Sequence, residues 1–222
     1  MDKVITICSS SYQYVTDTYD TEAACILNGI EETTAAVTTK SFEKDPVHIA
    51  VLGSVTYRKG HDLLVPSLLA LSEEEREKVV LHVIGKGELY RALEEEVAQH
   101  HMEEHCVLHG EVRDVTGLLG QMDAMLLPSR ADTVPISIIE GLRAALPVLS
   151  TRVGEIPRMI EDCGLLIEAT AQSITQGYRE ILGDRARFAQ YSVNARNRFE
   201  QRYTLEQMIS QYAAEINKMF EI

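Results

Sequence analysis

Residues 124–150 read Ala124-Met-Leu-Leu-Pro-Ser-Arg-Ala-Asp-Thr-Val-Pro-Ile-Ser-Ile-Ile-Glu-Gly-Leu-Arg-Ala-Ala-Leu-Pro-Val-Leu-Ser150. The stretch opens with an apolar run, passes through a polar loop into an amphipathic run, and ends in a second apolar run. Short apolar runs are typical of buried strands, and apolar residues three or four apart favour a helix. The stretch therefore predicts a strand over 124–127, a helix over 136–145 and a strand over 148–150.

The same alternation continues on both sides of this stretch. Further strands are predicted at 48–52, 79–84, 106–109 and 165–167, and the helices between them at 62–71, 88–99, 115–121 and 156–161. After residue 167 only helices are predicted, at 172–182, 185–201 and 205–220. Apolar strands that alternate with helices indicate a parallel sheet covered on both faces. We expect an α/β protein with a doubly wound, Rossmann-like parallel sheet and a helical C-terminal tail.

The first 46 residues differ from the rest, since the first arginine is Arg58. They predict a strand at 4–8, a polar helix or loop at 9–20 and a strand at 23–27, followed by a polar linker. One short βαβ piece cannot bury its own faces. We interpret 1–46 as the remnant of a domain whose beginning is missing, together with a linker, and 47–222 as the main domain.

Charge and cysteine content narrow the class of protein. The 222 residues include 21 Lys and Arg against 34 Asp and Glu, a net charge of −13, which argues against nucleic acid or anionic lipid as the main partner. There is no C-x-x-C pair among the four cysteines, and no signal peptide or membrane-spanning segment is evident. We expect reduced, buried thiols and a cytoplasmic protein. The cysteines are Cys8, Cys25, Cys106 and Cys163.

Ligands bind open parallel sheets at the carboxyl ends of the strands, so the loops after the strands are the candidate sites. The first runs from Gly53 to Gly60 and contains the adjacent bases Arg58 and Lys59. It predicts a phosphate clamp, with glycines that allow a close approach of the backbone. An ordinary exposed basic loop is the alternative. The second loop starts at Gly85, and a tight strand-to-helix turn explains its glycines equally well.

The third loop leads from Asp132 through Pro135 into the helix that carries Glu140. Pro135 suits the first turn of a helix, which leaves amides free near Val134 and at 136–138 to bind an anion. Glu140 lies in an apolar segment, where a carboxylate needs a partner. A vicinal diol, such as that of a ribose, would give it two donors. The alternative is that Glu140 simply points to solvent.

Two enzyme classes are excluded or disfavoured. No Walker A pattern occurs, which excludes a P-loop nucleotidase. The segment His101-Met-Glu-Glu104-His105 matches a zinc-protease motif, but it runs from a helix end straight into a strand. The two histidines should then not share a helical face, as zinc binding would need. We expect no metal site.

Residues 47–167 resemble the nucleotide-sugar-binding half of retaining glycosyltransferases of family 4, which have the GT-B fold. The resemblance is carried by Gly53…Arg58-Lys59-Gly60, by Ile84-Gly-Lys-Gly87, by Asp123-Ala-Met-Leu-Leu-Pro-Ser129 leading to Asp132…Glu140, and by Leu146-Pro-Val-Leu-Ser-Thr…Val153-Gly-Glu-Ile-Pro157. Residues 2–30 look like the last βαβ piece of the acceptor-side domain of that family.

The resemblance implies a role for each matching residue. Glu140 would bind the ribose, Asp132 would position the donor sugar, and Lys59, helped by Arg58, would hold the diphosphate and stabilise it as it leaves. The sugar and phosphates would be lined by Thr133, Val134, Pro135 and Ile136, and the donor site completed by Gly53 and by Gly85 and Val112 beside the base. The family uses no metal, so basic side chains and helix amides would take that role.

Three departures from the family pattern matter. Ser54 stands where the family usually has Arg, Asp132 is one methylene shorter than the usual Glu, and Arg158 replaces a favoured Glu. They could weaken the phosphate clamp or alter which sugar fits.

The expected function is transfer of a sugar from a nucleoside-diphosphate sugar, with retention of configuration, to a glycan, lipid or small-molecule acceptor. This chain would supply the donor-binding half and show little or no transfer alone. One alternative is a non-catalytic nucleotide-sugar-binding or assembly module that pairs with a separate acceptor domain or forms a homodimer. A sugar-nucleotide epimerase of GT-B type is the other. As part of a full enzyme, the chain could sit at the inner membrane face.

Overall fold

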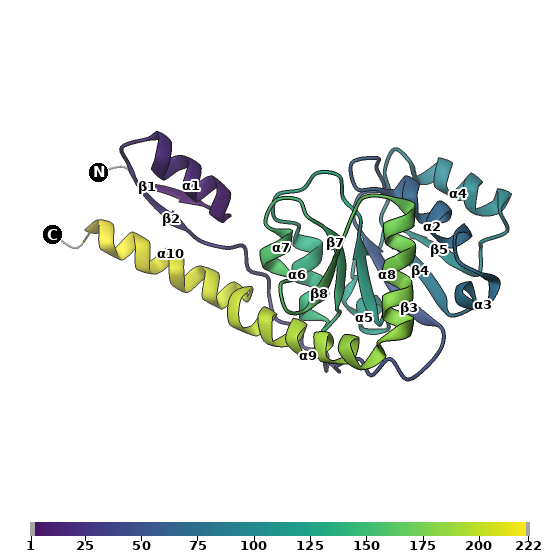
Figure 1. Ribbon diagram of the computed structural model, residues 1–222. Helices are drawn as coiled ribbons and strands as arrows, with labels where there is room; N and C mark the ends of the chain where they lie inside the picture. Colours follow the sequence, from purple (N-terminus) through teal and green to yellow (C-terminus); the bar gives the residue numbers. More distant parts are fainter. Residues whose placement is uncertain (1–2, 221–222) are drawn as a thin grey trace.

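The computed structural model describes residues 3–220 and contains a six-stranded parallel sheet with helices on both faces (Figure 1). Each strand lies within one residue of its predicted bounds at both ends. The α/β prediction is therefore confirmed. The strands are β3 (Val47–Leu52), β4 (Val79–Ile84), β5 (Cys106–Gly110), β6 (Ala124–Leu127), β7 (Val148–Thr151) and β8 (Gly164–Ile167).

The strand order, β5-β4-β3-β6-β7-β8, reverses direction between β3 and β6. From β3 the chain builds outward to β5, then returns to place β6 on the other side of β3, where Ile49 pairs with Ala124. A reversal of this kind opens a crevice at the carboxyl ends of the two central strands. The loops after β3 and β6, which carry the candidate phosphate and sugar residues, therefore meet.

Helices cover the sheet in two layers. One layer, α2, α4 and α8, packs on the face that carries Ile49 and Val51, and the other, α5, α6, α7 and α9, packs on the face of Ala50 and Leu52. This division follows from the alternation of side chains along a strand. The helices of the main domain are α2 (Leu64–Leu69), α3 (Glu73–Arg76), α4 (Tyr90–Gln99), α5 (Thr116–Gly120), α6 (Ile136–Arg143), α7 (Ile156–Met159), α8 (Ala171–Gly183) and α9 (Arg185–Arg202), and α10 (Leu205–Phe220) follows.

All eight helices predicted after residue 47 form; five are shorter than predicted, while α8, α9 and α10 lie within one residue of their predicted bounds. The one expected over 62–71 begins as a 3₁₀ turn, His61–Leu63, before α2. Pro66 lies in the first turn of α2, where an amide hydrogen is not needed. No helix within residues 3–220 is long and apolar enough to cross a membrane.

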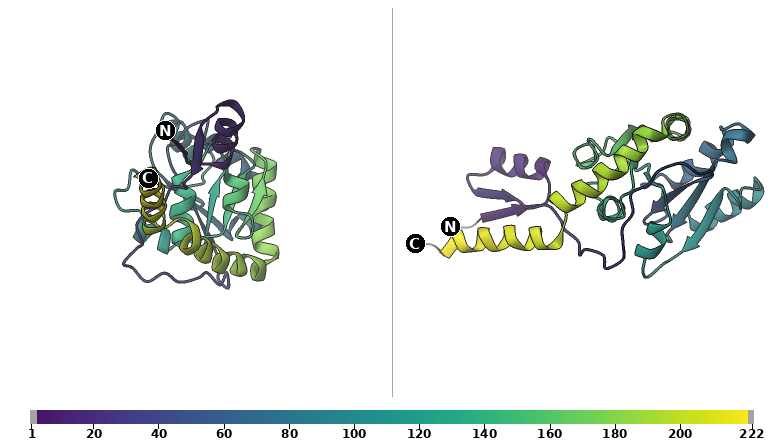
Figure 2. Two further views of the ribbon diagram at one scale, coloured as in Figure 1. Left: turned by 90° about the vertical axis from the view of Figure 1, so that its left-hand side faces the viewer. Right: turned by 90° about the horizontal axis from the view of Figure 1, so that it is seen from below.

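A separate N-terminal unit, residues 3–25, consists of β1 (Lys3–Thr6), α1 (Ser9–Thr18) and β2 (Glu22–Cys25). Its two strands pair in parallel with each other and not with the six-stranded sheet. The polar segment 9–20, left open between helix and loop, forms a helix with no buried residue. Figures 1 and 2 show the unit lying beside α10, to which it is joined by a 2.5 Å ion pair between Lys3 and Glu215.

Residues 31–46 form no helix or strand, as predicted for a linker, but the linker is anchored to the main domain. Phe42 is 3% exposed and packs on Phe188, with ring centroids 6.0 Å apart. The amide of Lys40 donates to the Ser192 hydroxyl at 2.7 Å. The apolar core thus reaches several residues upstream of β3.

The chain crosses between the N-terminal unit and the main domain twice, and the two crossings lie side by side. Ile30 and Thr204 form an isolated parallel bridge. The Ile30 amide donates to Tyr203 at 2.9 Å, and the Leu205 amide donates to Ile30 at 2.8 Å. A Cβ on Gly29 would lie 2.3 Å from the Thr204 carbonyl oxygen, so this approach requires glycine.

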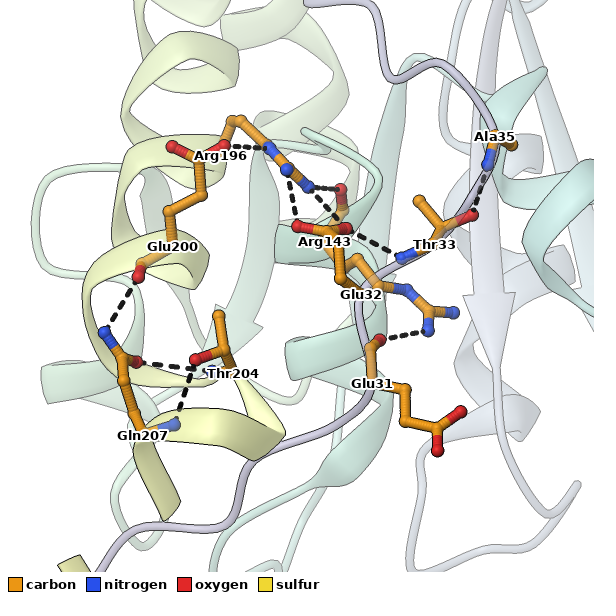
Figure 3. Close-up of polar contacts among 9 residues, drawn as sticks. All are labelled: Glu31, Glu32, Thr33, Ala35, Arg143, Arg196, Glu200, Thr204 and Gln207. Atoms are coloured by element: carbon orange, nitrogen blue, oxygen red, sulfur yellow. Dashed lines mark hydrogen bonds and ion pairs between the residues drawn. The ribbon is translucent and has the colours of Figure 1, made fainter. Parts of the chain in front are cut away.

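Side chains of α6 and α9 tie the first crossing to the main domain (Figure 3). Arg196 pairs with Glu32 at 2.6 Å, and Arg143 donates to the carbonyl of Glu31 at 2.9 Å. On the second crossing, the Thr204 hydroxyl caps the start of α10 by accepting from the Gln207 amide at 3.3 Å. Both crossings are therefore held at fixed points.

Candidate functional site

Lys59 and Asp132 meet in the crevice between the loops that follow β3 and β6. The Nζ atom of Lys59 lies 2.5 Å from Oδ2 of Asp132, and each side chain is only 11% exposed. The two residues are 73 positions apart in the sequence. The structure thus brings together the base and the acid that were predicted to share one pocket.

Asp132 is also held by its own loop. Its Oδ1 accepts from the Thr133 amide at 3.1 Å, and its Oδ2 accepts from the Ser129 hydroxyl at 3.4 Å. Ser129 is completely buried, and its carbonyl accepts from the hydroxyl of Thr151 on β7 at 2.5 Å. The Asp132 carboxylate is therefore oriented by Ser129, which is itself held by Thr151 of the sheet.

The N-terminus of α6 opens beside this pair. Pro135 is the N-cap residue, and no side chain caps the helix. Within residues 3–220, the amides of Ile136 and Ser137 have no acceptor, whereas the Ile138 amide donates to Pro135 at 3.1 Å. The prediction of free amides thus holds at 136 and 137 and is wrong at 138. Free amides at a helix start attract an anion.

Glu140 lies one turn further along α6 and is half-buried. Burial raises the pKa of its carboxyl group, and the positive charge of Arg143 opposes that rise. In the described part of the chain the Glu140 carboxyl has no hydrogen-bond or ion-pair partner. It therefore forms no ion pair with Lys59, and it has unused acceptor capacity.

Arg58 and Ile136 lie at the outer edge of the crevice. The guanidinium of Arg58 is exposed and donates to the Ala131 carbonyl at 3.0 Å, so it bridges the two loops instead of pointing away. Ile136, at the start of α6, is 42% exposed, while Ile138 and Ile139 are buried. Ile136 therefore belongs to the mouth of the crevice, not to the core.

A pocket of about 340 Å³ lies at the carboxyl ends of β3, β4 and β5. It contains Gly53, Gly85 and Val112, the residues predicted to complete the donor site around the base. Glu111 and Lys86 add charged groups that the sequence reasoning did not single out. The full lining is Leu52, Gly53, Ser54, Ile84, Gly85, Lys86, Glu111, Val112 and Val115.

The glycines of these loops have different roles. Gly53 has a φ of +143°, and a Cβ there would meet no atom within 4 Å, so it leaves open space at the pocket. Gly60 has a φ of +78°, and its Cβ would lie 2.2 Å from the Pro128 carbonyl oxygen. Gly60 was expected to let a ligand approach. Instead it lets the two loops touch.

Arg130 is a site residue that sequence reasoning missed. Its guanidinium forms two bonds of 2.7 Å to the carboxylate of Asp62 and lies 3.8 Å from the centre of the Tyr57 ring. The sequence feature that could have identified Arg130 is its position in the loop directly after the predicted strand 124–127, next to Ser129. The partners, 68 and 73 residues away, could not be inferred from sequence.

Glu155 was also missed, and it joins the main domain to the N-terminal unit. It is 7% exposed, and its carboxylate accepts from the Ser9 hydroxyl at 3.2 Å and from the Ser10 amide at 3.3 Å. These groups form the start of α1, so Glu155 caps a helix of the other unit. The Glu155 amide donates to Thr133 at 2.9 Å, next to Asp132.

The histidines of the 101–105 segment do not lie on one helix. Helix α4 ends at Gln99, and His101 has a φ of +53°, which a helix does not contain. Within residues 3–220 no group of three or more His, Cys, Asp or Glu is arranged to hold a metal ion. The four cysteines are free, three of them buried, while Cys25 is half-buried instead of buried.

Comparison with known proteins agrees with this arrangement. Residues 46–184 match the family described as "Glycosyl transferases group 1". N-acetyl-alpha-D-glucosaminyl L-malate synthase of Bacillus anthracis is 27% identical over 135 residues, which cover 60% of this chain and 35% of that protein. The lipopolysaccharide core biosynthesis mannosyltransferase LpsB of Rhizobium meliloti is 24% identical over 231 residues, covering 96% of this chain and 65% of that protein.

Among solved structures, that of Anabaena Alr3699/HepE in complex with UDP superposes with a TM-score of 0.82 at 16% identity, covering 97% of this chain and 63% of that one. The chain thus spans less than two thirds of the length of these relatives. The sheet and its C-terminal helices match the Rossmann-like half of GT-B glycosyltransferases, as the resemblance implied. Because the family match extends over more than half of its length, the chain belongs to the group 1 glycosyl transferases.

Proposed function

We propose that this chain is the donor-binding half of a retaining glycosyltransferase that uses a nucleoside-diphosphate sugar. The observation that carries the proposal is the Lys59–Asp132 pair beside the uncapped start of α6, at the reversal of strand order. A sugar linked to a diphosphate needs positive charge and amides at its phosphates and an acceptor at its hydroxyls. The HepE structure was solved with UDP, and the relatives named above are glycosyltransferases or a synthase of a glycosyl product.

The nucleoside end would occupy the pocket at Gly53, Gly85 and Val112. Next to it, Glu140 would accept from both hydroxyls of the ribose. A half-buried carboxylate without a partner gains most from such a pair of donors, because its desolvation is then compensated. This explains why an acid is placed within the apolar sequence of α6.

The diphosphate would bind to Lys59 and to the amides of Ile136 and Ser137. Lys59 would exchange the Asp132 carboxylate for a phosphate, which leaves Asp132 free to accept a hydroxyl of the donor sugar. As the bond between the sugar and the diphosphate breaks, negative charge grows on the phosphate oxygen. A fixed ammonium group and oriented amides stabilise that charge without a bound cation. Retention of configuration rests on the resemblance alone.

A calorimetric titration with UDP, GDP, ADP and their sugars tests donor binding. We expect one base to be bound, with Lys59→Ala and Glu140→Gln each weakening that binding by about 1–3 kcal/mol, the range for a lost charge-assisted bond. Glu73→Gln is the matched control, because Glu73 is an exposed acid on α3, which leads into the amino end of β4 at the sheet edge opposite the crevice. Absence of binding to every compound would refute the proposal.

A second candidate, a binding module that needs a partner, is favoured by the N-terminal unit. Of the eleven large apolar side chains exposed in the described part of the chain, five lie between residues 4 and 19. Among residues 3–220, nothing pairs with the outer edges of the two-stranded sheet of this unit, whereas parallel strands are normally enclosed. The five side chains are Val4, Ile7, Tyr12, Tyr14 and Tyr19.

The two candidates are separated by measuring transfer and assembly together. We expect the chain alone to bind the donor but to transfer little sugar, and sedimentation at two concentrations to show whether it self-associates. A monomer with full transfer activity would contradict the need for a partner. Proton NMR of any glycoside formed would report the anomeric configuration.

The free cysteines support a cytoplasmic location, which we also propose.

A further inference from the structure

Arg130 connects the two loops of the crevice through its side chain. The two parallel bonds to Asp62 use both ends of its guanidinium, and Nη1 also donates to the Tyr57 carbonyl at 2.6 Å. The central carbon of the group lies over the Tyr57 ring, 3.8 Å from the ring centre. Arg130 and Asp62 are 24% and 32% exposed. Bidentate pairing and stacking together are a geometry that arginine provides and lysine does not.

The backbones of the same loops are joined at the same place. The Arg130 amide donates to the Arg58 carbonyl at 2.8 Å, and Gly60 lies against Pro128. Contacts thus lie on both sides of Lys59 along the chain, at residues 57 and 58 before it and at residues 60 and 62 after it. The turn that carries Lys59 has little freedom to move relative to the loop after β6.

We propose that Arg130 is a positioning residue, which fixes the turn from Tyr57 to Asp62 so that Lys59 is presented to the diphosphate. The inference rests on the proposed function. The charge of Arg130 is already neutralised by Asp62, so its effect on the ligand passes through Lys59. Holding a flexible lysine in place before binding removes part of the ordering cost that the ligand would otherwise meet.

The test compares nucleoside diphosphate with nucleoside monophosphate, by calorimetry on the same preparations. UDP and UMP are used, or the guanosine or adenosine pair if the panel selects that base. The ratio of the diphosphate affinity to the monophosphate affinity reports the contribution of the second phosphate alone. If a variant contains less folded protein, both measurements are affected equally and the effect cancels in the ratio. The variants are Arg130→Lys, Asp62→Asn, Tyr57→Phe and Lys59→Ala, and the control is Arg91→Lys, an exposed ion-pair residue on α4.

We expect Arg130→Lys and Asp62→Asn each to lower the affinity ratio roughly 5- to 20-fold, with monophosphate affinity nearly unchanged, since contacting residues couple on this scale. Tyr57→Phe keeps the ring and should preserve the ratio, as should the control. In the Lys59→Ala background, Arg130→Lys should cause no further loss, because both changes act through the same ammonium group.

Four results would overturn the inference, each in a different way. An unchanged ratio in Asp62→Asn, together with a loss in Arg130→Lys, would make Arg130 a direct phosphate ligand. An equal further loss on the Lys59→Ala background would show that the two residues act independently. If the unmodified chain binds neither nucleotide, the proposed function fails and the inference fails with it. Normal binding, with a ratio that falls in Lys59→Ala but stays unaffected in Arg130→Lys and Asp62→Asn, rejects the inference alone.

Discussion

The main domain and the N-terminal unit reach their structures by different means. Strands β6 and β7 are buried along their whole length between two layers of helices, whereas α1 buries no residue at all. The main domain is therefore stabilised by its own apolar core. The N-terminal unit contributes the fully buried Cys8 to a core cluster of the main domain and is also held by polar contacts, notably those of Glu155 with α1 and of Lys3 with Glu215.

The largest expected difference between the two regions is in the cost of removing an aromatic ring. Phe188→Ala should lower the free energy of unfolding by about 3–5 kcal/mol, because Phe188 is fully buried and a cavity remains. Tyr14→Ala should change it by less than about 0.5 kcal/mol, because Tyr14 is 61% exposed. Urea unfolding measures both. Equal losses would show that α1 is packed as tightly as the main domain.

Acid should weaken the main domain through His61. Burial lowers the pKa of His61 from 6.5 to about 4. Between these pH values the histidine is protonated in the unfolded chain but not in the folded chain. Stability is therefore unaffected above pH 6.5 and falls between pH 6.5 and 4, by up to about 3 kcal/mol at roughly 1.4 kcal/mol per unit. Below pH 4 both states are protonated and the loss stops growing. Unfolding measured across this range checks the slope.

The matching variant is His61→Asn, whose amide oxygen can still accept from the Thr56 amide that Nδ1 binds at 3.4 Å. This variant should reduce, but not abolish, the fall in stability between pH 6.5 and 4. Part of the fall remains because burial also lowers the pKa of His82 to about 4. His100→Asn, at an exposed position, should leave the slope unchanged. The same slope in both variants would rule out His61 as its source.

The smallest expected effect concerns the attachment of the N-terminal unit. Glu155→Gln removes the charge that caps α1 and should weaken docking by about 1 kcal/mol, without a comparable loss for the main domain. Hydrogen exchange of the α1 amides should then be roughly fivefold faster, while β6 and β7 stay protected. Glu168→Gln is the control. Unchanged exchange in α1 would show that other contacts hold the unit.

Sequence alone predicted the six strands well, because runs such as 79–84 and 124–127 are almost wholly apolar, with His82 the exception, and are flanked by charged residues or by Gly and Pro. It also predicted that Lys59 and Asp132 share one crevice, since both follow strands whose carboxyl ends face the same edge. The roles of the nucleotide-binding residues remain predictions.

What the sequence could not provide depends on contacts between distant loops. The stacking of Arg130 on Tyr57, the packing of Gly60 against Pro128 and the capping of α1 by Glu155 all join segments that no local pattern links. Phe42 is a further case, since one apolar residue in a polar linker gives no periodicity. Its burial depends on Phe188, which packs against it from a distant part of the chain.

The paired crossings at Ile30 and Thr204 have a mechanical consequence. The two backbone segments that connect the N-terminal unit and α10 to the main domain are hydrogen-bonded to each other at one place, so they act as one connection instead of two separate ones. Because the backbone hydrogen bonds of Ile30 join the two crossings, neither crossing can slide along the other without breaking the bridge, and Gly29 provides the close approach that the bridge needs.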